Sequence, residues 1–208
     1  MTAQLSRARR AAVLAATAAA ALALAACGSG ADDPSGHDAH SSPSAPAKSA
    51  GGHNAADVTF AEGMIPHHRQ ALEMSELAAA RASSAEVKTL AEEIRAAQDP
   101  EIRTLSGWLA SWGEKVPAPG ADPHAGHGSG HAMSGMMSAD DMERLRTSSG
   151  AAFDTAFLSL MVEHHEGAVE MARTQRTEGA HAPARTMAEE IITAQNAEIT
   201  RMKALLDE

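Results

Sequence analysis

The chain carries one sequence unit twice. Residues 57–109 and 154–206 align without a gap at an offset of 97, and 19 of the 53 aligned positions are identical. Each copy contains Met-x-x-His-His, once from Met64 to His68 and once from Met161 to His165. Self-similarity of this length is the mark of a duplicated structural unit. The fold therefore has to accommodate two copies of one supersecondary element.

Each copy has the apolar spacing of two helices. In the first copy, apolar side chains recur every three or four residues from Phe60 to Ala78 and again from Val87 to Leu109. Ser84 and Pro183 are typical of helix starts. Only 2% of the residues are aromatic and none is tyrosine, which disfavours an all-β sandwich or barrel. The sequence predicts an all-α fold with four long helices in two duplicated pairs.

Four further positions bear on the helix ends. Asp57 and Asp154 stand at the start of the first helix of each copy, and we expect them to be N-caps, as we do Ser138 for a short helix that follows it. Pro66 lies inside the first helical pattern, where it lacks a backbone donor and clashes with the preceding turn. We expect a kink or a helix start at Pro66, and a straight helix in the second copy, which has Glu163 there.

The N-terminal residues resemble an export signal. Three arginines precede a run of small apolar residues from Ala11 to Ala26, which is too short for a bilayer span. The run ends in Leu24-Ala25-Ala26-Cys27-Gly28, which resembles the lipobox of bacterial lipoproteins. We predict a signal peptide at residues 1–26 and a lipid on Cys27 that anchors the protein to the outer face of the cytoplasmic membrane or cell envelope. An ordinary cleaved signal, or an uncleaved anchor with an incidental cysteine, is the alternative.

The remaining composition bears on tether, partners and ligands. Residues 27–54 are rich in Gly, Ser, Pro and Ala, which predicts a flexible tether ahead of the folded residues 55–207. Removing residues 1–26 takes away three of the 17 basic side chains, so 14 remain against 27 acidic ones, a formal charge of −13. Such a chain disfavours nucleic acid and favours cations as partners. Cys27 is the only cysteine, so a soft-metal site has to use methionine and histidine.

The paired motif places potential metal ligands on the inner face of its helix. At about 100° per residue, Met64, His67 and Met74 point along the apolar stripe, and His68 lies on its shoulder, toward a neighbouring helix. A methionine stripe is more often ordinary core, and a lone buried histidine is usually held by hydrogen bonds. Four histidines in one core, however, need a metal or a hydrogen-bond network to satisfy their ring nitrogens. The candidate metal ligands are Met64, His67, His68, Met74, Met161, His164, His165 and Met171.

The second helix of each copy has polar residues in or beside its apolar stripe. Gln98 falls at the centre of the stripe and Glu101 at its edge, and Gln195 and Glu198 repeat them. We interpret these four residues as a possible second shell that holds an imidazole N–H, or as a source of an extra oxygen ligand. Alternatively, they face a water-filled end of the bundle.

Residues 113–138, between the copies, are rich in Gly, Pro and His. Such a linker cannot form a core, but its imidazoles and thioethers can wrap a copper, nickel or zinc ion. Low-complexity histidine tracts also occur without any metal role. The possible linker ligands are His124, His127, His131, Met133, Met136 and Met137. If these serve only weak sites, replacing residues 124–137 by Gly and Ser should leave the helices and the bundle site intact.

Two long motifs resemble a known bacterial family. They are Met-x-x-His-His-x-x-Ala-x-x-Met, at residues 64–74, and Ala-x-x-Ile-x-x-x-Gln-x-x-Glu-Ile, at residues 91–102 and 188–199. Both are similar to motifs of domain-of-unknown-function family 305, and the resemblance covers about residues 55–207. It implies a ferritin-like four-helix bundle in exported proteins, some of which bind copper and serve copper tolerance. It also implies functional roles for the eight candidate ligands named above.

These observations lead to one hypothesis with two rivals. We expect a lipid-anchored protein, not an enzyme, that sequesters Cu(I) or hands it on outside the cytoplasmic membrane, because thioether ligands favour Cu(I) over harder ions. The first rival is a metal-free interaction module of the envelope. The second is a ferritin-like di-iron oxidase, whose sites use Glu-x-x-His on two helices. No Glu-x-x-His lies within the four predicted helices.

Overall fold

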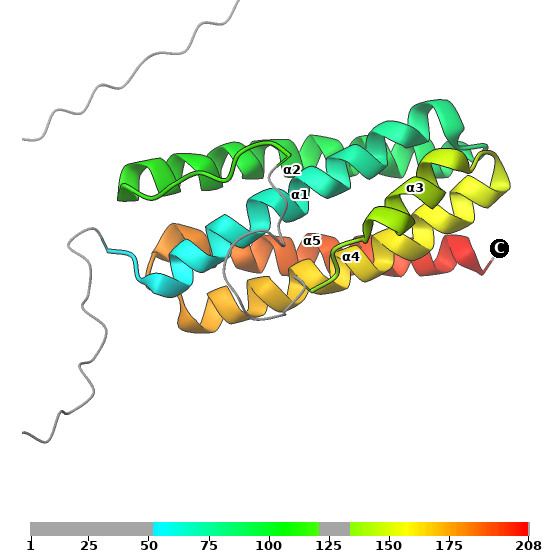
Figure 1. Cartoon of the computed structure of the whole chain (residues 1–208). Coiled ribbons are helices and arrows are strands. Elements are labelled where there is room, and N and C mark those ends of the chain that lie inside the picture. Colours follow the sequence, from blue (N-terminus) through cyan, green and yellow to red (C-terminus); the bar gives the residue numbers. More distant parts are fainter. Residues whose placement is uncertain (1–51, 121–133, 208) are drawn as a thin grey trace, which may run out of the picture. The chain divides into compact units, whose positions relative to one another are not determined.

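The computed structural model describes residues 52–120 and 134–207. These residues form five helices and no strand: α1 (Ala55–Arg81), α2 (Ala85–Trp112), α3 (Ala139–Thr147), α4 (Ala151–Glu178) and α5 (Ala182–Leu206) (Figure 1). The predicted all-α fold is confirmed. The described helices include none that is both long and apolar enough to cross a membrane. The following predictions lie outside the described residues: the signal peptide, the lipid on Cys27, nearly all of the tether, and the linker ligands His124, His127, His131 and Met133.

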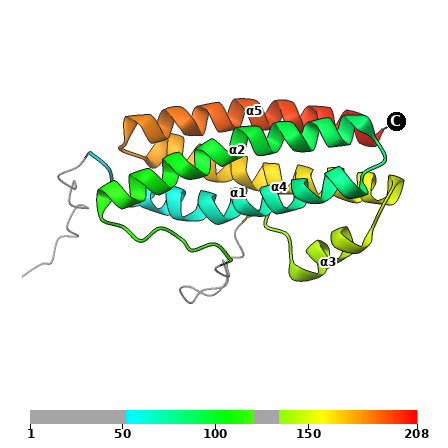
Figure 2. The same ribbon diagram turned by 90° about the horizontal axis from the view of Figure 1, so that it is seen from above.

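The four long helices form a bundle whose halves are the two sequence copies. α1 packs along α2 and α4 along α5, and the two hairpins meet chiefly through α1 and α4 (Figures 1 and 2). We call the line of contact between α1 and α4 the seam. Because α1 and α4 run in opposite directions (Figure 1), equivalent residues of the two copies lie on opposite sides of the middle of the seam.

Several helix ends follow the sequence signals. Ser84 caps α2 and Ser138 caps α3 through their side-chain oxygens, and Pro183 lies in the first turn of α5, as predicted. Pro66 does not start a helix, because α1 begins at Ala55 and continues through it. The neighbouring turns of α1 are buried in the bundle, and this packing outweighs a local cost of about 3 kcal/mol.

Asp57 and Asp154 are buried side chains that join the two hairpins, and the prediction that they are N-caps is wrong. The N-cap of α1 is Asn54, and α4 follows a glycine without a side-chain cap. Asp57 accepts hydrogen bonds from two backbone N–H groups of the loop at residues 179–181, between α4 and α5. Asp154 does the same for the loop at residues 82–84, between α1 and α2. We call these contacts the carboxylate clasps, because each hairpin satisfies the loop of the other.

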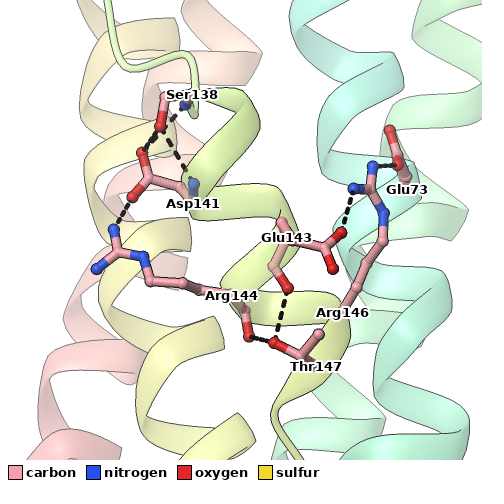
Figure 3. A network of polar contacts seen from close by, with 7 residues as sticks. All are labelled: Glu73, Ser138, Asp141, Glu143, Arg144, Arg146 and Thr147. Carbon is pink, nitrogen blue, oxygen red and sulfur yellow. Dashed lines mark hydrogen bonds and ion pairs between the residues drawn. The ribbon is translucent and has the colours of Figure 1, made fainter.

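The short helix α3 lies on the outside of the bundle against α1 and α4. Ser138 and Asp141 form a capping box at its start, and Arg144 pairs with Asp141 (Figure 3). Arg146 reaches Glu73 of α1 at 2.6 Å (Figure 3). The two apolar side chains of α3 that face the bundle are buried. The residues that precede α4 are thereby fixed to the first copy as well as to the second.

Both ends of the 113–138 linker pack on α1. Arg69 donates a hydrogen bond to the Pro117 carbonyl at 2.7 Å, and the Gln70 amide binds the backbone of Met137. The side chain of Met137 is only 6% exposed and belongs to the apolar core. Replacing residues 124–137 would therefore remove a core residue, contrary to the expectation from sequence. A test of the linker ligands has to stop at residue 133.

Candidate metal centre

Four histidines meet in the middle of the bundle. His67 and His68 of α1 and His164 and His165 of α4 have no exposed surface. The rings of His67 and His164 touch across the seam, with centroids 3.7 Å apart and planes inclined by 40°. Two motifs that lie 97 residues apart in sequence thus build one group of side chains, which we call the histidine cluster.

His68 and His165 reach from the seam to α2 and α5. His68 Nε2 lies 2.7 Å from Glu101 Oε2, and His165 Nε2 lies 2.7 Å from Glu198 Oε2. Because a carboxylate accepts hydrogen bonds, each Nε2 carries a proton that it donates to its glutamate, and each Nδ1 has no hydrogen-bond partner among the described residues. The two glutamate side chains are 25% and 21% exposed. Each pair therefore links a buried imidazole to the surface of the bundle and fixes its tautomer.

The histidine cluster contains six ring nitrogens that have no hydrogen-bond partner among the described residues: both of His67, both of His164, and Nδ1 of His68 and of His165. Burial lowers the pKa of His67 to about 3; His68 and His165 add to the fall, and the Ser134 backbone opposes it. Burial, together with the neighbouring imidazoles, lowers the pKa of His164 well below its ordinary value. His67 and His164 are therefore neutral at pH 7. Their unpaired lone pairs are costly in a dry core and suit a metal ion.

Methionines lie on both sides of the histidine cluster. Met64 belongs to one apolar group, and Met74 and Met161 belong to another. All three are fully buried, whereas Met171 is half-buried. Ten residues of α1 separate Met64 from Met74, which is about 15 Å along the helix axis, so the structure does not bring these two sulfurs into one ligand shell. Met64 and Met161, one turn before the histidines of their own helices, are the better-placed thioethers.

The predicted polar residues of α2 and α5 fall into two kinds. Glu101 and Glu198 bind imidazoles, as described above. Gln98 and Gln195 are each 3% exposed, and their carbonyl oxygens accept no hydrogen bond from the part of the chain that the structure describes. At this level of burial they do not face a water-filled end of the bundle. Gln98 and Gln195 therefore each add one unsatisfied oxygen acceptor to the interior of the bundle.

The donor groups do not yet form a complete coordination shell. Within residues 52–120 and 134–207, no three His, Asp or Glu side chains converge on one point. The contact between His67 and His164 is one reason, because rings with centroids 3.7 Å apart leave no room for an ion between them. An ion has to separate the two rings or to bind beside them with a thioether. Neutral imidazole with thioether is a donor set for a soft ion.

Two other described histidines lie at one end of the bundle. His53 stacks on Trp112 with centroids 4.5 Å apart, and His181 meets Trp108 and Trp112 edge-on at 5.3 Å. Glu178 and His181 form the one Glu-x-x-His of the chain. This sequence runs from the end of α4 into the following loop, so it does not place the two side chains on one helical face.

Replacing Glu101 by alanine should release the tautomer of His68. Without this acceptor the Nε2–H tautomer is no longer stabilised over the Nδ1–H tautomer, and the ring proton is distributed between both nitrogens. We expect ring ¹⁵N NMR to show mixed tautomers of His68, and the affinity for a transition-metal ion to fall by about 10- to 100-fold. Glu101→Gln, which keeps an acceptor oxygen, should lie near the parent protein, as should the exposed control Glu92→Ala. An unchanged His68 spectrum in Glu101→Ala would contradict this assignment.

Comparison with known proteins agrees with this architecture. Residues 57–206 match the sequence profile of a family described as domain of unknown function DUF305. A DUF305 protein of Streptomyces coelicolor is 32% identical, with a TM-score of 0.65, and the match covers 73% of this chain and 92% of that one. A DUF305 fragment from Deinococcus radiodurans is 29% identical, with a TM-score of 0.65 and coverage of 74% and 97%.

A third similar structure is a copper complex. CopM in its Cu(I)-bound form is 32% identical, with a TM-score of 0.59, and the match covers 73% of this chain and 95% of CopM. CopM structures with Cu(II) and with silver are similar as well. Among curated proteins, none matches. Since the profile match spans nearly the whole bundle, from the start of α1 to the end of α5, the chain belongs to the DUF305 family.

Proposed function

We propose that this DUF305 protein binds Cu(I) at the histidine cluster and sequesters it or hands it on. The observation that carries the proposal is the set of six unpaired imidazole nitrogens buried among the described helices. Met64 and Met161 add thioether sulfur nearby, and the chain has no cysteine beyond Cys27 to offer a thiolate. This donor set favours soft monovalent copper. The similarity to CopM, which has been solved with Cu(I) and with silver, supports the same chemistry here.

The proposal places this binding outside the cytoplasmic membrane, on a protein held there by a lipid on Cys27. The ion is cargo, and the protein catalyses no reaction on it. A di-iron oxidase would need glutamates that bridge two irons. The two glutamates beside the histidine cluster, Glu101 and Glu198, are each engaged with a histidine. Binding is thus better supported than oxidase chemistry.

Competition between metal ions tests the proposal. The full chain and a variant with residues 121–133 replaced by Gly and Ser would be titrated with Cu(I), Ag(I), Cu(II) and Zn(II) against chelators. We expect both proteins to bind Cu(I) and Ag(I) tightly, and the variant to keep its helicity and lose only weak sites. Loss of all binding in the variant would place the site in the linker. Absence of binding in both proteins is the result expected of a metal-free interaction module.

A further inference from the structure

The four residues Ser134–Met137, which we call the strap, lie directly against α4. A Cβ atom built on Gly167 would stand 2.0 Å from the Ser134 carbonyl oxygen, and one built on Gly135 would stand 2.6 Å from the Glu163 carbonyl oxygen. Gly135 also has a positive φ of 77°, which side chains other than glycine rarely adopt. Strap and helix thus touch backbone to backbone, and only glycine at these two positions permits it.

On α1 the strap is held by a side chain. Gln70 accepts a hydrogen bond from the Met137 N–H at 2.7 Å and donates one to the Met137 carbonyl at 3.0 Å. A third bond runs from Ser134 Oγ to Glu170 Oε2 on α4, at 2.6 Å. The strap therefore crosses the seam, with one end on α4 and the other on α1.

The strap contacts equivalent positions of the two copies in different ways. Gln70 and Gly167 occupy equivalent positions of the two copies, 97 residues apart. In one copy this position supplies an amide that binds the strap, and in the other it supplies the bare backbone on which the strap rests. Two equivalent positions of a nearly symmetric pair of helices have thus become different where a single segment crosses both.

The strap crosses at the level of the histidine cluster. Gln70 lies one turn after His67, and Gly167 lies one turn after His164. A Cβ atom built on Gly135 would also stand 3.0 Å from the His164 carbonyl oxygen. Both rings are fully buried. Next to the strap, a groove of about 150 Å³ is lined by Pro66, Gln70 and the half-buried Met136, among others.

We propose that the strap is the removable cover of the histidine cluster, and that Cu(I) enters and leaves when the strap lifts from Gln70 and Gly167 while the four long helices stay packed. This inference rests on the proposed Cu(I) binding. The strap is attached by three side-chain hydrogen bonds and by the buried side chain of Met137, whereas opening the cluster from α2 or α5 would separate long helices along their packed faces. Local openings of the least-held segments are the cheapest fluctuations of a folded protein. Gln70 and Gly167 are then positioning residues that set the rate of exchange.

The experiment compares Gly167→Ala and Gln70→Leu with the parent, each as the full chain purified in detergent. Gly107→Ala is the matched control, because a Cβ on Gly107 meets no described atom within 4 Å. Cu(I) transfer from the loaded protein to excess chelator is followed by stopped flow, and Cu(I) affinity is measured at equilibrium. We expect transfer to be about tenfold faster or more in both variants, since each loses contacts that close the strap. Affinity should change by less than about threefold, because the ligands are untouched.

A second readout needs no metal. Modification of His67 and His164 by diethyl pyrocarbonate in the apo protein should be faster in both variants by a similar factor, with circular dichroism unchanged. Parent-like rates of modification and transfer in both variants, or acceleration in Gly107→Ala as well, would overturn the proposal. If the parent binds no Cu(I) while histidine modification responds as expected, the strap is a cover and the proposed function is the part that fails. Gly135→Ala, which displaces the strap from its own side, has to reproduce the result of Gly167→Ala.

Discussion

His67→Leu is expected to weaken Cu(I) binding by about a hundredfold or more while the apo protein melts at the same temperature as the parent or higher. Residues that only support a metal ligand are worth about 10- to 100-fold in affinity, so a ligand itself should be worth at least as much. In the apo protein both ring nitrogens of His67 are buried without a partner among the described residues. Replacing such a group by an apolar one removes a desolvation cost of about 1–3 kcal/mol.

Titration of Cu(I) against a chelator and thermal melts of the apo forms would check this result. His164→Leu is the matched variant, because its ring is the partner of His67 across the seam. Met64→Leu keeps the core volume, at a cost usually under about 1.5 kcal/mol, and should lower Cu(I) affinity more than Zn(II) affinity. A large loss of apo stability in His67→Leu would instead indicate a structural histidine.

The stability of His67→Leu should also be less sensitive to acid than that of the parent. The pKa of His67 falls to about 3 in the folded protein, from an ordinary value of 6.5. The unfolded chain therefore binds a proton below pH 6.5 that the folded protein does not bind until about pH 3. The contribution of His67 to the free energy of unfolding is fully present above pH 6.5. It is lost as the pH falls from 6.5 toward about 3, at about 1.4 kcal/mol per pH unit for each such histidine. His67→Leu should reduce the dependence of the unfolding free energy on pH by about 1.4 kcal/mol per pH unit, the contribution of one histidine.

Asp57→Ala is expected to lower the free energy of unfolding by about 3 kcal/mol or more. The carboxylate accepts hydrogen bonds from the Gln175 side chain at 2.6 Å and from the backbone of Ala180 and His181 at 3.0 and 3.1 Å. Its loss leaves the buried Gln175 amide and two part-buried backbone N–H groups without this partner. For a domain of this size, about 3 kcal/mol corresponds to a fall in melting temperature of roughly 10 °C. Asp154→Ala should have an effect of the same kind at the other clasp.

Thermal and chemical denaturation provide the measurement. Asp141→Ala is the control, because Asp141 caps only the short helix α3 and should cost about 1 kcal/mol. Burial raises the pKa of Asp57, but its hydrogen bonds to Gln175 and to three backbone N–H groups outweigh this and hold the pKa below its usual value. The stability from Asp57 is thus present above pH 3.8 and lost as the pH falls further. A melt of Asp57→Ala within about 2 °C of the parent would show that the clasp contributes little.

The helices and the burial of the four histidines could be predicted because they depend on short-range pattern and on the duplication, whereas the meeting of the two pairs across the seam could not. Helical spacing places His67 inward and His68 toward the next helix, and the offset of 97 transfers both statements to the second copy. The same geometry contains the distance between Met64 and Met74, since ten residues of helix are about 15 Å. Two residues on the same face of a helix can still lie far apart along its axis.

The clasps and the strap could not be predicted, because they depend on contacts between distant segments. Asp57 reaches residues more than 120 positions away, and nothing in its own neighbourhood distinguishes it from an N-cap. The strap lies in a segment without periodicity, so its contacts leave no repeating pattern. Gln70 and Gly167 differ between the copies next to the shared histidines, but so do 34 of the 53 aligned positions, and the difference alone does not single them out.

The carboxylate clasps also bear on how such a chain could arise. A single helical hairpin with an aspartate at the position of Asp57 would leave its own loop unsatisfied and would carry a carboxylate with nothing to bind. Two identical hairpins related by a two-fold axis would each supply what the other lacks, and their histidine pairs would meet at that axis. The present chain has the form of such a symmetric dimer joined into one polypeptide. Within one polypeptide, a single connecting segment with no symmetric counterpart can lie across this axis.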